Sequence, residues 1–285
     1  MPATVRQQGY FFLYGAKKAC ALRRCLYLHA MTEFDPLTRP IVFLHLPKTG
    51  GQTIHHAVGA HVGSANISPY RLHVQTTGKT SFPPEYRMHS GHLHWTELDS
   101  IPGNPFSFMV LRDPRERLGS FFFFMREEAR KNRDANGEDK LPLVHRALLQ
   151  SASSVFFSND PQVRDMIEEH WANLTVTYLA TRTLRRRGPM KALSLDELLT
   201  RAEENSRALT AIYRFGEFDK IEADLEPILG ARPEIATKRA NPGPLDPSRS
   251  RWQALLEELD SDAERHQMGR FVDEDDALMQ RIAFR

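Results

Sequence analysis

The chain has 285 residues, of which 41% are hydrophobic and 26% are charged, as in an ordinary globular protein with one sizeable core. A formal net charge of +2 is too small to indicate a nucleic-acid partner. Two cysteines argue against a disulfide-stapled secreted domain and against a four-cysteine metal site.

Residues 1–38 are predicted to be a poorly ordered extension that precedes a single domain over residues 39–285. The extension is weakly apolar, but basic residues interrupt it, and no stretch of the chain approaches the roughly 20 apolar residues of a membrane span. Without a span or paired cysteines, we expect a cytoplasmic protein whose extension could still touch a membrane surface.

The first strong signal is an apolar, partly β-branched run at residues 41–46, which predicts a buried strand. The loop Lys48-Thr49-Gly50-Gly51-Gln52-Thr53 follows it, and residues 54–60 can continue as a helix. Glycines allow close approach of the backbone to a ligand, while the amides and dipole of a helix N-terminus attract anions. Because Lys48 adds a mobile charge and Thr53 a hydroxyl, the loop is predicted to bind phosphate or sulfate.

The residue order of this loop differs from that of the common nucleoside-triphosphate loop, in which the lysine follows the glycines. Here Lys48 precedes Gly50 and Gly51. Taken alone, the segment could also be an ordinary strand-to-helix turn, so its interpretation depends on a second motif.

Residues 63–84 are polar and are predicted to form a loop over the site, and residues 86–92 a short strand that ends in histidines. Histidine titrates near neutral pH and can accept and then release a proton. The segment from His89 to His94 is therefore the strongest source of a general base, and a structural role stays open for each of its histidines.

The second motif follows another apolar run, at residues 106–111, which predicts a strand. Arg112 falls at the carboxyl end of this strand, where open α/β sheets bind ligands. Asp113 can cap a helix that begins at Pro114, and Ser120 lies about two turns into that helix. Guanidinium can grip a phosphate with two parallel hydrogen bonds, although a surface arginine beside a capped helix would look the same.

The remaining pattern alternates strands and helices, which predicts one α/β domain with a parallel sheet. An exposed loop is expected at residues 132–140 and a fourth strand at residues 211–216. Helices are expected at residues 142–152, 161–180, 195–209, 218–229, 249–259 and 273–284.

The two motifs, Pro-Lys-Thr-Gly-Gly-x-Thr and Arg-Asp-Pro-x-x-Arg-x-x-Ser, resemble elements of sulfotransferases that use 3′-phosphoadenosine 5′-phosphosulfate (PAPS). The resemblance implies a P-loop-like, three-layer domain with a central parallel sheet flanked by helices. It implies that the loop from Lys48 to Thr53 binds the 5′-phosphosulfate, and that Arg112 and Ser120 hold the 3′-phosphate. PAPS would be a co-substrate, and no metal would be required.

Glycosaminoglycan 2-O-sulfotransferases carry a Gly-His element between these motifs, which Gly91-His92 resembles. By that match His92 is the general base. Lys48, expected near the bridging oxygen on which charge appears during transfer, is the second predicted catalytic residue. The sequence departs from their His-Gly-His form, since Ser90 stands where the first histidine would be. The resemblance implies a hydroxylated acceptor such as a glycan or glycolipid. A looser C-terminal match makes Lys238 and Arg239 candidates to touch the nucleotide.

Two other functions stay open at this point: an ATP-using phosphotransferase of the P-loop kinase type, and a non-catalytic nucleotide- or glycan-binding module. The position of Lys48 argues against the first, as does the lack of a clear acidic, Mg²⁺-binding strand end beyond Asp113. The joint presence of Lys48, Arg112, Ser120 and His92 argues against the second. The sequence indicates neither the identity of the acceptor nor the oligomeric state.

Overall fold

A computed structural model describes residues 38–184, 187–237, 245–246 and 248–285. Every described residue belongs to one compact unit, Pro36–Arg285. Residues 1–37 of the predicted extension lie outside the described residues, as do Lys238 and Arg239.

The described residues form a four-stranded, all-parallel sheet in the order β2-β1-β3-β4. The strands are β1 (Ile41–Leu44), β2 (Met88–Gly91), β3 (Phe106–Leu111) and β4 (Ala211–Arg214). Leu44 lies opposite Gly91 on one side and Met109 on the other, so the carboxyl ends of the strands meet at one edge. The chain leaves β1 toward β2 and then crosses to β3, which makes the ends of β1 and β3 a topological switch point.

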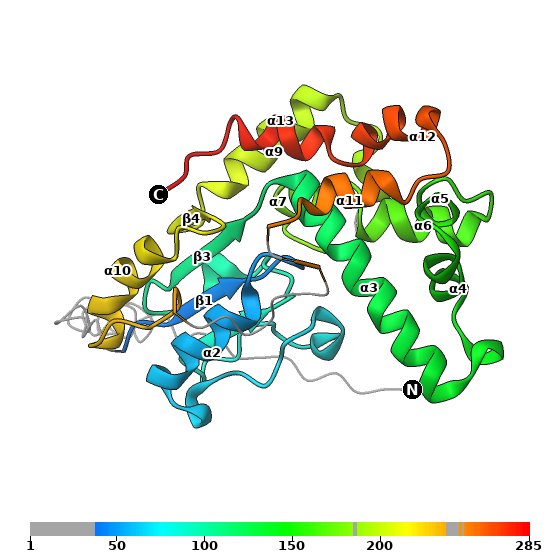
Figure 1. The fold of residues 1–285 in the computed structure, drawn as a ribbon. Coiled ribbons are helices and arrows are strands. Elements are labelled where there is room, and N and C mark those ends of the chain that lie inside the picture. The colour runs from blue at the N-terminus through cyan, green and yellow to red at the C-terminus, as the bar shows by residue number, and fades with distance from the viewer. Residues whose placement is uncertain (1–37, 185–186, 238–244, 247) are drawn as a thin grey trace, which may run out of the picture. The chain divides into compact units, whose positions relative to one another are not determined.

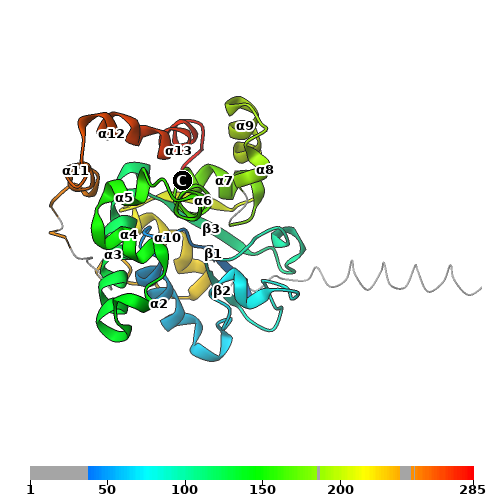
Figure 2. The ribbon, with the colours of Figure 1, turned by 90° about the vertical axis from the view of Figure 1, so that its right-hand side faces the viewer.

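Helices cover both faces of the sheet (Figures 1 and 2), which confirms the predicted α/β class. One face, which carries Ile41, Phe43 and Phe108, packs on α2 (Gly51–Val62) and α10 (Phe218–Leu229). The other face, which carries Val42, Leu44 and Met109, packs on α7 (Leu174–Thr181), α9 (Leu195–Ser206) and α13 (Asp273–Met279). Strand side chains alternate between faces, so both layers draw on the same strands.

A separate apolar cluster joins helices beyond the sheet, among them the long α3 (Pro114–Asn136). Phe122, Phe123 and Trp171 are buried in it. The other helices of the described residues are α4 (Leu143–Gln150), α5 (Ala152–Phe156), α6 (Pro161–His170), α8 (Arg187–Met190), α11 (Arg251–Glu257) and α12 (Asp262–Gln267). Short 3₁₀ turns occupy Ser64–Asn66, His73–Thr76, Leu98–Ser100, Glu138–Lys140 and Met268–Phe271. No helix in the described parts of the chain combines the length and apolarity needed to cross a membrane.

The predicted strand 106–111 and helix 218–229 are confirmed residue for residue. The predicted loop 132–140 is wrong in its first half, because α3 continues with a solvent-exposed polar turn to Asn136. Helix 142–152 is instead two helices that meet at Ser151, whose side chain caps α5 by accepting from the amide of Ser154 at 3.1 Å. The short α12 was not expected from the sequence pattern.

The predicted helix 161–180 is wrong at its centre, where three residues separate the end of α6 from the start of α7. Asn173 takes a left-handed φ of 44° at the break, a conformation that asparagine tolerates better than most residues. Its side chain donates to the carbonyl of Arg270 at 2.9 Å and accepts from the amide of Glu274 at 3.2 Å. Distant residues therefore stabilise a break that the local pattern does not show.

A buried ion pair connects α3 to the helices on the far side of this break. Arg117 donates to the carbonyl of Trp171 at 2.9 Å and lies 3.8 Å from Asp275. Asp275 also accepts from the amides of Thr175 and Val176, at 3.2 and 2.8 Å, and so caps the start of α7. Burial raises the pKa of Asp275, although the charge of Arg117 opposes that shift.

We expect Arg117→Met to lower the free energy of unfolding by about 3–5 kcal/mol, because it leaves the buried Asp275 without its partner. Urea unfolding followed by circular dichroism would measure the loss. Arg281→Met, which breaks the more exposed pair with Asp196, is the control and should cost about 1 kcal/mol or less. Equal losses in the two variants would contradict the structural role of the buried pair.

Candidate functional site

The loop after β1 leads directly into the N-terminus of α2. Lys48 and Gly50 both take left-handed φ values, 71° and 81°, and Thr49 is buried with its hydroxyl donating to the carbonyl of Leu46 at 2.9 Å. Helix α2 begins at Gly51, earlier than predicted, with Gly50 at its N-cap and no side-chain cap. The amides of Gly51 and Gln52 precede the first intrahelical bond, so helix geometry leaves them without an acceptor inside α2. This N-terminus is therefore suited to an anion.

Thr53 completes the first turn of α2, where it is half-buried. The whole predicted loop thus lies at one helix end, but its residues have different roles. Thr49 acts within the fold by closing the turn, whereas Lys48 and the α2 amides belong to the open end.

Gly51 allows a histidine ring to lie directly under the start of α2. A Cβ at Gly51 would fall 2.0 Å from ring atoms of His45, so no side chain fits there. His45 lies just beyond β1, and its ring stacks on that of His92 with centroids 4.4 Å apart. Burial, followed by the charges of His92 and Arg71, holds the pKa of His45 well below its usual range. His45 is therefore a neutral, buried ring that packs against His92.

His92 follows β2 and has a defined tautomer. Its Nδ1 lies 2.6 Å from the carbonyl oxygen of His45, and since a carbonyl can only accept, Nδ1 carries the proton. The lone pair of the neutral ring is then on Nε2, as a general base requires. Burial lowers the pKa of His92, the hydrogen bond to His45 opposes this, and the charge of Arg71 adds to the lowering.

The other two candidate histidines are tied into packing. His89 is buried within β2, and burial lowers its pKa to about 4. His94 accepts from the amide of Leu184 at 3.1 Å through Nδ1. Of the three histidines, His92 thus has the arrangement best suited to proton transfer.

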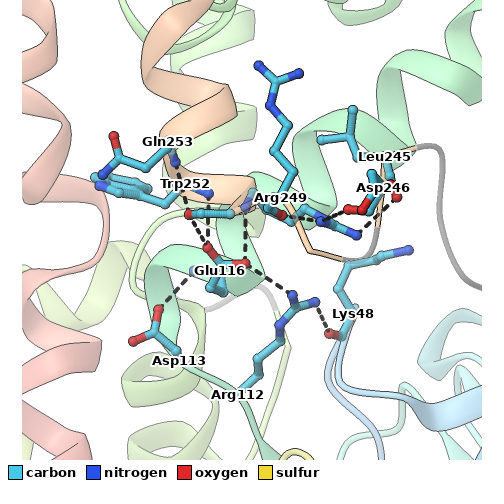
Figure 3. A network of polar contacts seen from close by, with 11 residues as sticks. Lys48, Arg112, Asp113, Glu116, Leu245, Asp246, Arg249, Trp252 and Gln253 are labelled. Atoms are coloured by element: carbon cyan, nitrogen blue, oxygen red, sulfur yellow. Dashed lines mark hydrogen bonds and ion pairs between the residues drawn. The ribbon is translucent and has the colours of Figure 1, made fainter.

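The two predicted phosphate motifs touch each other at the switch point. Arg112 donates to the carbonyl of Lys48 and to Glu116, both at 3.4 Å, as Figure 3 shows. These bonds are long, so the guanidinium keeps capacity for a stronger acceptor. Burial lowers the pKa of Lys48, and the charges of Arg112 and Arg251 lower it further. An anion bound between these cations would reduce their repulsion.

Ser120 lies one turn after Glu116 on the same side of α3, since residues four apart share a helix face. Its side chain is half-exposed, and within the described residues the structure gives its hydroxyl no hydrogen bond. Asp113 caps α3 as predicted, accepting from the amide of Glu116 at 2.9 Å. The helix thus carries Ser120 on the same side as Glu116, which contacts Arg112, and does not use the Ser120 hydroxyl in the fold.

Two aromatic rings flank the cations and were not singled out for this role from the sequence. Nζ of Lys48 lies 4.3 Å from the ring centre of Phe124 on α3. The guanidinium of Arg112 lies 5.0 Å from that of Phe215, which follows β4 and is 41% exposed. A Cβ at Gly50 would lie 3.1 Å from the same Phe215 ring. The prediction placed Phe215 within the strand 211–216, whereas β4 ends at Arg214 and Phe215 lies just beyond it. Its place near the carboxyl end of a predicted strand was a usable signal, because strand ends converge.

Two arginines at the site also escaped the sequence analysis. Arg251, at the start of α11, influences the pKa of both Lys48 and Arg112 by its charge. Arg71 donates to the hydroxyl of Ser90 at 3.4 Å and contacts Nδ1 of His55. Neither lies in a recognisable motif, and only the tertiary fold brings them here.

No protein-family model matches this sequence, and no curated protein matches it. Among the residues that the structure describes, no group of three or more His, Cys, Asp or Glu side chains is placed to hold a metal ion. The motifs and the geometry of their side chains are consequently the basis for assigning a function.

The lowered pKa values of two histidines allow a prediction of how the free energy of unfolding changes with pH. Burial lowers the pKa of both His55 and His89 to about 4, from the ordinary value of 6.5 that a histidine has in the unfolded chain. Between these values the unfolded state binds more protons, so the free energy of unfolding should fall as the pH drops from about 6.5 toward 4. Urea unfolding across this range would test this, and His89→Gln should flatten the slope. Stability that rises as the pH falls would contradict the neutral, buried state of these rings.

Proposed function

We propose that the protein is a PAPS-dependent sulfotransferase that moves a sulfuryl group to a hydroxyl of a glycan or glycolipid acceptor. The observation that carries the proposal is the contact between Arg112 and the carbonyl of Lys48. It means that one nucleotide could reach both predicted phosphate sites, the open end of α2 and the end of β3. The proposal includes a P-loop-like domain, in which the anion loop follows a central strand of the sheet.

In the proposed reaction, the α2 amides and Lys48 hold the phosphosulfate, and Nε2 of His92 takes the proton of the acceptor hydroxyl. The acceptor oxygen forms a bond to sulfur as the bond from sulfur to the bridging oxygen breaks. The electron pair of that bond stays on the bridging oxygen, as charge on the departing 5′-phosphate. Lys48 and the helix N-terminus oppose this charge, and donors aimed in this way are worth about 3–4 kcal/mol each.

Arg112 and Ser120 would hold the 3′-phosphate, and the exposed ring of Phe215 offers a face on which adenine could stack. The kinase alternative has less support, because the carboxylate of Asp113 is used to cap α3 rather than being free for Mg²⁺. A non-catalytic module would not need the tautomer that the His45 carbonyl imposes on His92.

We expect the protein to bind 3′-phosphoadenosine 5′-phosphate (PAP) in preference to ATP with Mg²⁺, as measured by isothermal titration calorimetry. Arg112→Ala should weaken PAP binding about 10- to 100-fold, the effect of losing charge-assisted hydrogen bonds. Tighter binding of ATP than of PAP would favour a phosphotransferase instead.

Transfer of isotope-labelled sulfate from PAPS to a panel of glycans and glycolipids, resolved by mass spectrometry, tests the activity itself. Lys48→Ala should lower kcat about 100- to 1,000-fold, because its charge acts on the leaving oxygen during transfer. His92→Ala should abolish transfer with little change in PAP affinity. His61→Ala, at an exposed histidine in the last turn of α2, is the matched control and should behave as wild type.

A further inference from the structure

The carboxylate of Glu116, in the first turn of α3, joins segments that lie far apart in the sequence (Figure 3). One oxygen accepts from the hydroxyl of Ser250 at 2.6 Å and from the amide of Trp252 at 3.2 Å. The other accepts from the amide of Arg251 at 3.1 Å and from Arg112 at 3.4 Å. A single side chain thus contacts both a predicted phosphate ligand and the start of α11.

The contacts of Glu116 complete the N-terminus of α11. Ser250 is the N-cap and accepts from the amide of Gln253 at 3.2 Å, while Glu116 serves the two amides before it. A carboxylate at a helix N-terminus is favoured by the helix dipole. Burial acts to raise the pKa of Glu116, but the hydrogen bonds from Ser250, Arg251 and Trp252 outweigh it and the pKa is lowered. Glu116 is therefore ionised at neutral pH.

Of the N-termini of α2, α3 and α11, two are closed by protein groups. Asp113 caps α3, and Ser250 with Glu116 caps α11, whereas α2 has no side-chain cap. The negative charge of Glu116 consequently does not compete for the open helix end. The carboxylate of Glu116 instead fixes the start of α11 beside the open end of α2.

The capping fixes the position of Arg251. The guanidinium of Arg251 donates to the carbonyls of Leu245 and Asp246, at 3.1 and 2.6 Å, which folds the preceding residues around it. A Cβ at Gly119 would fall 2.3 Å from the carbonyl oxygen of Arg251, so α11 approaches α3 as closely as a glycine permits. The position of Arg251 relative to Arg112 thus depends on the contacts of α11 with α3.

We propose that Glu116 is a positioning residue of the nucleotide site, which docks α11 against α3 and holds the guanidinium of Arg112 beside Lys48. It acts through Arg112 and Arg251 and does not itself touch the nucleotide, because both of its oxygens already accept two hydrogen bonds. The identity of the ligand in this inference rests on the proposed function, whereas the docking of α11 does not.

Glu116→Gln removes the charge and one acceptor while keeping the size of the side chain. We expect it to weaken PAP binding and to raise the KM for PAPS at least about tenfold, with kcat at saturating PAPS nearly unchanged. Hydrogen exchange at the amides of Arg251 and Trp252 should become faster even without nucleotide, because glutamine keeps one acceptor oxygen for the two amides and places a donating NH2 group where the other oxygen was.

Glu197→Gln is the matched control. Glu197 accepts from the amide of Ser194 at 2.8 Å in the capping box of α9, so the same chemical change is made at another helix start. It should leave PAP affinity, the KM for PAPS and exchange at α11 unchanged. A Glu116→Gln protein that binds PAP like wild type, or that loses affinity no more than Glu197→Gln does, overturns the positioning role.

Failure of the proposed function would look different. If the wild-type protein does not bind PAP, the sulfotransferase assignment fails, and the exchange measurement alone then judges the docking of α11. Unchanged exchange at Arg251 and Trp252 in Glu116→Gln would overturn the docking role whatever the ligand is.

Discussion

Two partly buried cations, Lys48 and Arg112, are held side by side at the ends of β1 and β3, and the rest of the site depends on this arrangement. Like charges repel, and burial adds a desolvation cost to each. Phe124 and Phe215 offset part of this cost through their ring faces, and the carbonyl of Lys48 accepts from Arg112. Two like charges that are placed together and partly buried in a well-packed fold are typical of a binding site rather than of a structural core.

The sheet explains how much of this arrangement was predictable from sequence. The strand 106–111 is an uninterrupted apolar run, and its end is marked by Arg112, Asp113 and Pro114, each with a local reason for its position. Parallel strands bring their carboxyl ends together, so two such ends could be expected to meet. Local pattern and tertiary structure agree wherever one strand–helix unit contains all the information.

Prediction failed where distant residues decide the local conformation. Asn173 breaks a helix because Arg270 and Glu274 bond to its side chain, and nothing near residue 173 shows this. The roles of Glu116 and Arg251 likewise arise from a contact between residues that lie 135 positions apart in the sequence. The tautomer of His92 was also not predictable from the sequence, because the backbone carbonyl of His45, just beyond β1, determines it.

The bond between Glu116 and Ser250 joins residues 134 positions apart. Closing so long a loop costs more conformational entropy than forming the strand–helix units does, which disfavours its early formation. During folding, β1, β2, β3 and α2 can assemble within residues 41–111, and α11 can then dock beside them. Ligand affinity would in that case be acquired in the final stage of folding, rather than with the strands that carry its most recognisable motifs.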